Sequence, residues 1–425
     1  MKMLWKARSG QNLITSLRGI ASKLLEQPFP LRVMMVADRA LLRLALYRTD
    51  TSGSKHVILN SPGSGNIGDQ AMFESFIANV QDEIVAIVRS TDAYSLPSSS
   101  LSSRVSFLVL PRLVYSKFAA HYRDIWILGR SIRNATSFSV MGADIMDGGY
   151  GVHSSMVEWN IARTIQDAGI PARILGFSWN GKAHPEIVRQ AREAGLSGVR
   201  ILPRDPDSCE RLLKDNVSSV TQASDMVFAF PSSSVTSSSR PIMNTDTNAE
   251  KKMAVVNVSG LIGSRIEQNV EYEHVLETLE DLGYSCLLLP HVSHSNVDDI
   301  AAISSLRARS AVASRARFQE ELMSPTDVLE IVRKADVVVT GRMHLSILAL
   351  STCTPVIVLA TQGKVSGLMK LFGIPDHCVE PTVGFGRRIA RLLVGVERNR
   401  EEILDKVSSS LPAVRALCQI NFEHE

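Results

Sequence analysis

The chain has 425 residues, 45% of them hydrophobic, so it is long enough for two domains that each bury a core. The net charge of +3 is small, and no Lys/Arg blocks are interleaved with aromatic residues, which argues against a nucleic-acid partner. The five cysteines lack CxxC spacing, which argues against a zinc site or disulfides and is typical of a reducing compartment. No apolar run reaches the roughly 18 residues of a membrane span.

The first fifty residues are basic, with nine Lys or Arg against three Asp or Glu. Apolar residues at helical spacing within 13–25 and 33–46 predict two amphipathic helices. Three interpretations stay open: contact with an anionic membrane surface, packing across the first domain, and an Arg- and Ser-rich targeting segment. We therefore expect a cytoplasmic protein, with peripheral membrane contact through residues 1–50 as an open alternative.

A first series of alternating strands and helices fills residues 51–230. This alternation predicts a mostly parallel sheet. Strands are predicted at 56–60, 84–88, 107–110, 138–141, 173–178 and 199–202, and helices at 67–80, 116–130, 154–168, 185–194 and 209–213.

The glycine-rich turn after the first strand is a candidate site. Gly63, Gly65 and Gly68 match the G-x-G-x-x-G pattern of dinucleotide-binding folds. Asp69 follows at once and would place a carboxylate where a pyrophosphate binds, which counts against a dinucleotide. We interpret Asn66 and Asp69 as groups offered to substrate hydroxyls or to a proton transfer. The alternative is that both stabilise only the turn and the helix start.

Two further features follow strands of this series. The loop 142–151 contains Asp144 and Asp147, and its pattern is compatible with a substrate loop or an ordinary turn; without a partner His or third acid it does not indicate a metal site. Arg204 follows the strand at 199–202. It is either the ion-pair partner of a nearby acid, such as Asp205 or Asp225, or half of an anion clamp.

Residues 231–251 are rich in Ser, Thr and Asn, which predicts a flexible linker, and a second α/β series with closing helices fills 252–425. Strands are predicted at 254–258, 286–289, 337–339 and 356–359, and helices at 272–282, from 324, at 343–351, from 365, and at 386–410.

The transition from the strand at 337–339 to the next helix carries Arg342 and His344. Ligands of parallel sheets bind at the carboxyl ends of strands, beside helix N-termini that favour anions. Arginine matches carboxylate or phosphate, and histidine can pass a proton. The alternative is an Arg342 ion pair with a neighbouring element and a His344 that only starts the helix. His291 and His294 also follow a strand; without a third ligand no metal is expected, and His291 is assigned to substrate binding.

These patterns predict an α/β protein of two Rossmann-like domains with mostly parallel sheets that face a cleft. Arg204 and Asp69 are expected to meet Arg342 and His344 in that cleft.

An ordered set of segments resembles the polysaccharide pyruvyltransferases. The set spans roughly residues 56–380 and comprises 66–69, 142–148, 204–208, Asp225 and 341–344 with the apolar helix after it. The resemblance implies a fold similar to the GT-B glycosyltransferases. It also implies transfer of the pyruvyl group of phosphoenolpyruvate to a sugar of a polysaccharide or exopolysaccharide precursor, as a ketal, with release of phosphate.

The resemblance also implies roles for individual residues. Arg204 and Arg342 would hold the carboxylate and phosphate of phosphoenolpyruvate, His344 would be the general acid, and Asp69 would assist protonation or activate a hydroxyl. Many members have Gly-Gly-Gly where this chain has Gly-Ala-Asp at 142–144, so the acceptor contacts assigned to Asp144 do not follow from the resemblance. We expect no cofactor and no metal, since arginines can neutralise the leaving phosphate.

Two other functions fit the predicted architecture. One is a sugar-nucleotide-dependent glycosyltransferase of the GT-B type, and the other is a non-catalytic carbohydrate-binding protein. The expected partners of the favoured function are phosphoenolpyruvate and a sugar or lipid-linked glycan, with no nucleic acid.

Overall fold

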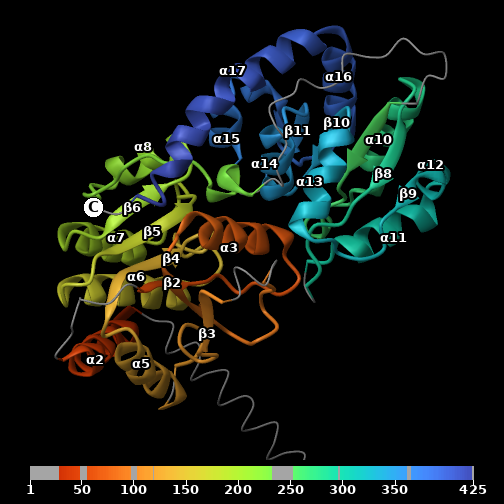
Figure 1. Ribbon diagram of the computed structural model, residues 1–425. Coiled ribbons are helices and arrows are strands. Elements are labelled where there is room, and N and C mark those ends of the chain that lie inside the picture. The colour runs from red at the N-terminus through yellow and green to blue at the C-terminus, as the bar shows by residue number, and fades with distance from the viewer. Residues whose placement is uncertain are drawn as a thin grey trace, which may run out of the picture.

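The computed structural model contains two α/β units, each built on a six-stranded sheet with helices around it (Figure 1). Every strand pairing is parallel. The fold class predicted from the sequence is therefore confirmed. The residues that the structure describes are 28–47, 55–96, 103–117, 119–231, 252–294, 297–360 and 365–423.

The first sheet has the strand order β3-β2-β1-β4-β5-β6, with the apolar strands β1 and β4 at its centre. Its strands are β1 (Lys55–Leu59), β2 (Glu83–Val88), β3 (Val105–Val109), β4 (Ala135–Met141), β5 (Ala172–Phe177) and β6 (Arg200–Pro203). The helices of this unit are α2 (Pro28–Leu46), α3 (Ile67–Asn79), α5 (Ala119–Ser131), α6 (Val152–Asp167), α7 (Pro185–Leu196), α8 (Pro206–Lys214) and the 3-10 helix η1 (Met226–Ala229).

The second sheet has the order β12-β11-β10-β7-β8-β9. Its strands are β7 (Met253–Val256), β8 (Ser285–Leu288), β9 (Arg317–Phe318), β10 (Val337–Thr340), β11 (Val356–Leu359) and β12 (Cys378–Val379). Its helices are α9 (Gly260–Gly263), α10 (Asn269–Asp281), α11 (Asp299–Arg309), α12 (Ala311–Arg315), α13 (Pro325–Lys334), α14 (Met343–Ser351), α15 (Ser366–Leu371), η2 (Pro375–His377), α16 (Phe385–Arg398) and α17 (Arg400–Gln419).

The strands and helices predicted from apolar patterns are confirmed, with shifts at their ends. The helix predicted at 209–213 begins at Pro206, because Asp205 caps it and proline suits the first helical position. The helix predicted at 386–410 is wrong as one element: α16 ends and α17 begins around Asn399. The two-residue strands β9 and β12 were missed, since so short a strand leaves no periodic signal. The helix predicted at 13–25 and residues 232–251 of the predicted linker lie outside the described residues.

The two units are joined by specific contacts beyond the linker. Asp207 of α8 accepts hydrogen bonds from Ser366 (2.9 Å) and Lys370 (2.7 Å) of the second unit. The chain end returns to the first unit, where the carbonyl of Glu423 accepts from Arg173 (3.0 Å) and Arg200 (3.1 Å), beside β6 (Figure 1). The contacts of Asp207 lie beyond the carboxyl end of β6, while those of Glu423 lie at the amino ends of β5 and β6, so the two units are joined at both edges of the first sheet. Among the described residues, no helix is both long and apolar enough to cross a bilayer.

Candidate functional site

The glycine-rich turn after β1 contacts the loop that follows β8 across the border between the units. The backbone N–H of Ile67 donates to the carbonyl of His291 (3.2 Å), and that of Ser293 donates to the carbonyl of Gly65 (2.8 Å). Both segments follow the carboxyl ends of their strands. This is the edge at which ligands bind in open parallel sheets.

His344 lies in the first turn of α14 and reaches across this border. A Cβ added at Gly68 of α3 would overlap its imidazole ring, so the ring packs directly on the Gly68 backbone. On its other side, Nε2 lies 3.6 Å from Oδ2 of Asp225, an ion-pair distance too long for a hydrogen bond. Within the described chain, Nε2 has no hydrogen-bond partner although it is buried. The structure therefore brings His344 of the second unit into contact with the first.

Arg204 is buried and shares Asp225 with His344, and its guanidinium is held by three side chains. Nε donates to Ser178 Oγ (2.9 Å), Nη1 to Asp225 Oδ2 (3.0 Å) and Nη2 to Asp144 Oδ1 (2.5 Å). Burial alone would raise the pKa of Asp225, but the charges of His344 and Arg204 outweigh it and lower that pKa to about 2. Asp225 therefore stays ionised and links the buried arginine to the histidine.

Arg342 is held by the fully buried carboxylate of Asp299. Its Nη2 lies 2.5 Å from Oδ1, and Nε lies 3.2 Å from both carboxylate oxygens. Asp299 also accepts from Asn257 and from the backbone N–H groups of Gly260, His291 and Val292. The hydrogen bonds of the Arg342 side chain to described residues involve only Nε and Nη2, and 11% of the side chain is exposed. Asp299 thus orients Arg342 and leaves one edge of its guanidinium for a ligand.

His291 is buried next to these groups. Neither ring nitrogen has a hydrogen-bond partner among the residues described. Burial, together with the positive charges of His344 and Arg342, holds its pKa well below the usual range, so the imidazole is neutral. Buried polar atoms are nearly always paired, and two orphaned nitrogens beside Arg342 indicate the place of a polar ligand.

Asp69 lies on the opposite wall, in the first turn of α3. It is buried, and Gly63 N–H donates to its Oδ2 (3.3 Å). Burial raises the pKa of Asp69, and the nearby charge of His344 only partly offsets this effect. A carboxyl group that is easily protonated near a histidine can take part in proton transfer.

The other predicted residues have mixed surroundings. Asn66 caps α3, since its Oδ1 accepts from Gly68 N–H (3.0 Å), which is the local role left open above. Asp144 is 38% exposed and contacts Arg204. The structure thus links Asp225 to both Arg204 and His344, places Asp144 on Arg204, and brings Asp69 within electrostatic reach of His344 and Asp144. His291 lies within electrostatic reach of His344 and Arg342. Asp299 and Ser178 were not identified from the sequence, because an acid at a helix start and a serine after a strand carry no distinctive signal.

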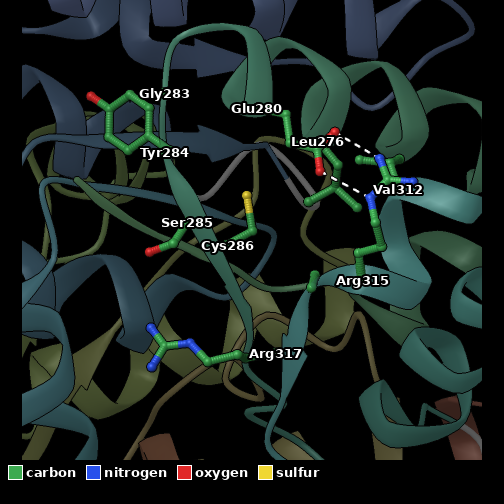
Figure 2. Close-up of a pocket in the computed structure, with 10 residues that line it drawn as sticks. Leu276, Glu280, Gly283, Tyr284, Ser285, Cys286, Val312, Arg315 and Arg317 are labelled. Atoms are coloured by element: carbon green, nitrogen blue, oxygen red, sulfur yellow. Dashed lines mark hydrogen bonds and ion pairs between the residues drawn. The ribbon is translucent and has the colours of Figure 1, made fainter. Parts of the chain in front are cut away.

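A separate hollow of about 280 Å³ lies at the amino ends of β8 and β9, the sheet edge away from this site (Figure 2). Two arginines line it: Arg315 is paired with Glu280 at 2.8 Å, and the exposed Arg317 begins β9. Burial raises the pKa of its Cys286 thiol to about 12, so the thiol stays protonated. The hollow therefore offers neither an unpaired charge at Arg315 nor a nucleophile at Cys286. No group of three or more potential metal-binding side chains occurs within the ranges that the structure describes.

Solved structures share this two-unit fold, which is that of the GT-B enzymes. The chain is similar to a putative UDP-N-acetylglucosamine 2-epimerase from Listeria monocytogenes, with 12% identity, 88% of this chain and 97% of that chain covered, and a TM-score of 0.54. It is similar to UDP-GlcNAc 2-epimerase from Neisseria meningitidis, with 11% identity, 86% of this chain and 97% of that chain covered, and a TM-score of 0.52. It is also similar to Glycyrrhiza uralensis UGT73P12, with 12% identity, 87% of this chain and 93% of that chain covered, and a TM-score of 0.52. At these identities the likeness defines the fold alone.

The sequence defines the family more narrowly. The family model of the polysaccharide pyruvyl transferases matches residues 66–363, and the chain belongs to this family of transferases. The match begins at Asn66 and includes Asp69, Arg204, Arg342 and His344. A search of curated protein sequences found no match.

Proposed function

We propose that the protein transfers the pyruvyl group of phosphoenolpyruvate to a sugar of a polysaccharide or its precursor, forming a ketal and releasing phosphate. One observation carries this proposal: Nη1 of Arg342, the ring nitrogens of His291 and Nε2 of His344 make no hydrogen bond with the described residues, and the carboxyl of Asp69 lies within electrostatic reach of His344. An anionic donor and a proton-transfer step need such a set of groups.

The donor anion is assigned first to Arg342. Its Nη1 and the ring nitrogens of His291 can donate to phosphate or carboxylate oxygens without breaking an existing hydrogen bond. The N-terminus of α14, which follows directly, adds the partial positive charge of a nine-residue helix. Since burial keeps His291 neutral, it donates from only one ring nitrogen at a time.

The contribution of Arg204 requires an exchange of partners. Its N–H groups already bind Ser178, Asp225 and Asp144, and only Asp144 among these is substantially exposed. A donor anion would reach Arg204 by displacing the carboxylate of Asp144 from Nη2. Donor binding at Arg204 and the acceptor contact assigned to Asp144 would therefore be coupled, because the same carboxylate takes part in both.

The proposed chemistry begins with proton transfer from His344 to the methylene carbon of phosphoenolpyruvate. Positive charge develops at the adjacent carbon, and a sugar hydroxyl attacks that carbon while Asp69 accepts its proton. The C–O bond to phosphate then breaks, and a second hydroxyl closes the ketal on the same carbon. Of the two hydroxyl protons, one restores His344 and the other leaves with phosphate. A positioned acid contributes about 10²–10⁴-fold to such a rate.

The test combines the protein with phosphoenolpyruvate and a panel of free, nucleotide-linked and lipid-linked β-galactosides or mannosamine-containing glycans. We expect pyruvate addition by mass spectrometry and phosphate release in equal amounts. If UDP, and not phosphoenolpyruvate, raises the melting temperature, the glycosyltransferase alternative is favoured. If His344→Ala and Arg342→Ala leave biological output unchanged and no phosphate is released, the site is a non-catalytic carbohydrate-binding one.

We also propose that residues 1–50 contact an anionic membrane surface. In α2, the buried face packs on the first unit, while Val33, Val36 and Leu44 of the helix and Tyr47 just after it are each more than half exposed and follow one another at helical spacing. An exposed apolar stripe in a segment with nine Lys or Arg suits an interfacial helix.

Sedimentation with vesicles tests the membrane contact. We expect the full chain to bind phosphatidylglycerol vesicles more than phosphatidylcholine vesicles, and the pair Val36→Asp and Leu44→Asp to reduce that binding. Leu196→Asp is the matched control, because Leu196 is 81% exposed on α7, outside the stripe. Equal binding to both vesicle types would overturn the proposal.

A further inference from the structure

The strand order of the first sheet aligns four strand-end loops. The order β3-β2-β1-β4 places Tyr115 after β3, Arg89 after β2, Asp69 after β1 and Asp144 after β4, all along the carboxyl edge. Neighbouring loops are linked by backbone hydrogen bonds from Leu110 to the carbonyl of Val88 and from Asn60 to that of Ile87. The loops of β3 and β2 therefore lie beside the turn that carries Asp69, on the side away from Asp144.

Tyr115 and Arg89 form an exposed pair at this edge. Tyr115 is 43% exposed, and the Arg89 guanidinium lies over its ring, 5.4 Å from the centroid. Arg89 is itself exposed and makes no hydrogen bond or ion pair with the residues that the structure describes. An aromatic ring and an uncompensated cation are thus presented together.

A path of contacts runs from Tyr94, which lies within electrostatic reach of Tyr115, to the proposed reaction centre. The hydroxyl of Tyr94 donates to the carbonyl of Ser61 (2.8 Å), and its ring lies so close to Gly63 that a Cβ there would overlap it. Gly63 in turn donates to Asp69. The phenol of Tyr115 lies within electrostatic reach of the carboxylate of Asp69 and of Tyr94.

We propose that Tyr115 and Arg89 form the acceptor subsite, in which the ring supports the apolar face of a pyranose and the guanidinium binds a negative charge carried by the same acceptor. This inference rests on the proposed function, because it names the class of sugar that Asp69 would activate. The carboxyl groups of Asp69 and Asp144 follow neighbouring strands at this edge, and an anionic acceptor needs a cation to approach them. Arg89 supplies that cation on the side from which the acceptor enters.

Two groups on the acceptor could supply the negative charge that Arg89 binds. One is the diphosphate that links a sugar to a lipid or nucleotide carrier, and the other is the carboxylate of a neighbouring uronic acid. Both present oxygens that match a guanidinium. A neutral glycoside would use the tyrosine alone.

Direct binding to the full chain tests the subsite without requiring turnover. The probes are UDP-galactose, a short-chain polyprenyl diphosphate galactose, a galacturonate-containing oligosaccharide and methyl β-galactoside, and affinities are measured by saturation-transfer NMR. We expect Tyr115→Ala to weaken binding of the preferred probe by about three- to fivefold and Tyr115→Phe to change it by less than about twofold, as for an exposed ring contact. Arg89→Ala should weaken the charged probes by a similar factor and leave methyl β-galactoside unchanged.

Controls keep the proposal falsifiable. Arg130→Ala removes another exposed arginine at the end of α5, which leads to the amino edge of the same sheet, and should leave all affinities unchanged. If Tyr115→Ala does not fold, Tyr115→Leu replaces it, since leucine keeps apolar bulk without a flat ring. Unchanged affinities in the Tyr115 and Arg89 variants, or no binding of any probe to the wild type, overturn the subsite. Probe binding that responds to these variants without phosphate release from phosphoenolpyruvate would overturn the proposed reaction and leave the subsite intact.

Discussion

The site has two walls, a first wall formed by residues of the first unit and a second wall formed by residues of the second unit. Each wall holds its arginine in a different way. Arg204 on the first wall is fully buried and saturated by Ser178, Asp225 and Asp144. Arg342 on the second wall is held on one edge by Asp299, and its other edge and the neighbouring His291 remain unpaired. The first wall is therefore acidic and internally neutralised, while the second is basic with donors to spare. In the proposed reaction, this difference favours binding of the anionic donor by the second unit and of the hydroxyl-bearing acceptor by the first.

The largest effect is expected where the walls meet. His344→Ala removes the proposed proton donor and should lower phosphate release from phosphoenolpyruvate by about 10²–10⁴-fold. Initial rates at saturating donor measure the effect. His274→Ala, which removes an exposed histidine on α10, should retain the wild-type rate. A His344→Ala enzyme as fast as the wild type would contradict the role of this residue.

The two arginines should separate stability from binding. Arg204→Ala removes the cation that hydrogen-bonds the buried carboxylate of Asp225 and should lower the free energy of unfolding by about 3–5 kcal/mol. Arg342→Ala should cost less stability, because Asp299 keeps four other hydrogen-bond donors, but it should raise the KM for phosphoenolpyruvate. Urea unfolding and donor titration measure the two quantities. Equal losses of unfolding free energy in the two variants would contradict the claim that Arg204 serves mainly stability and Arg342 mainly donor binding.

Gly68→Ala tests whether the first wall positions the acid of the second. The new methyl group would overlap the His344 ring and displace it, so we expect turnover to fall about tenfold, equivalent to roughly 1.4 kcal/mol. Gly395→Ala is the matched control, since a Cβ added there in α16 has nothing within 4 Å. Full turnover in Gly68→Ala would show that the ring does not depend on this contact.

The smallest effect is expected at Glu158, a buried carboxyl group of α6 in the first unit. Burial raises its pKa from an ordinary value of 4.5 to about 8. The protonated side chain therefore stabilises the fold fully below pH 4.5, and this contribution is lost as the pH rises toward 8. Glu158→Gln should remove this loss and raise the melting temperature at pH 8, relative to wild type, by roughly 3–8 °C more than at pH 5. An equal difference at both pH values would contradict a raised pKa.

Much of the fold could be predicted from the sequence because parallel strands buried on both faces leave uninterrupted apolar runs. The runs at 56–60 and 337–339 became β1 and β10 in this way. The short strands β9 and β12 and the break between α16 and α17 left no such signal. Their boundaries depend on tertiary contacts, such as the bond from Arg400 to Asp336 at the start of α17.

Several residues of the candidate site could be predicted from the sequence, but their hydrogen-bond and ion-pair partners could not. Arg342 and His344 follow a strand directly, and strand-end positions can be read from the chain. Their partners cannot, because Asp299 lies 43 residues from Arg342 along the sequence. The departure at 142–144 illustrates this limit: Ala143 adopts a φ of 41°, a conformation that glycine enters freely, and Asp144 next to it occupies Arg204. Only the folded structure relates that substitution to the arginine.

One apolar cluster crosses the border between the two units. It includes Phe73 and Phe76 of α3, Phe228 of η1, and the strands and helices of the second sheet, and Phe228 packs on Phe372 with ring centroids 5.6 Å apart. Two domains that share a core cannot lose their structure independently. We therefore expect a single cooperative melting transition, and a ligand bound between the walls should shift that whole transition because it stabilises both units at once.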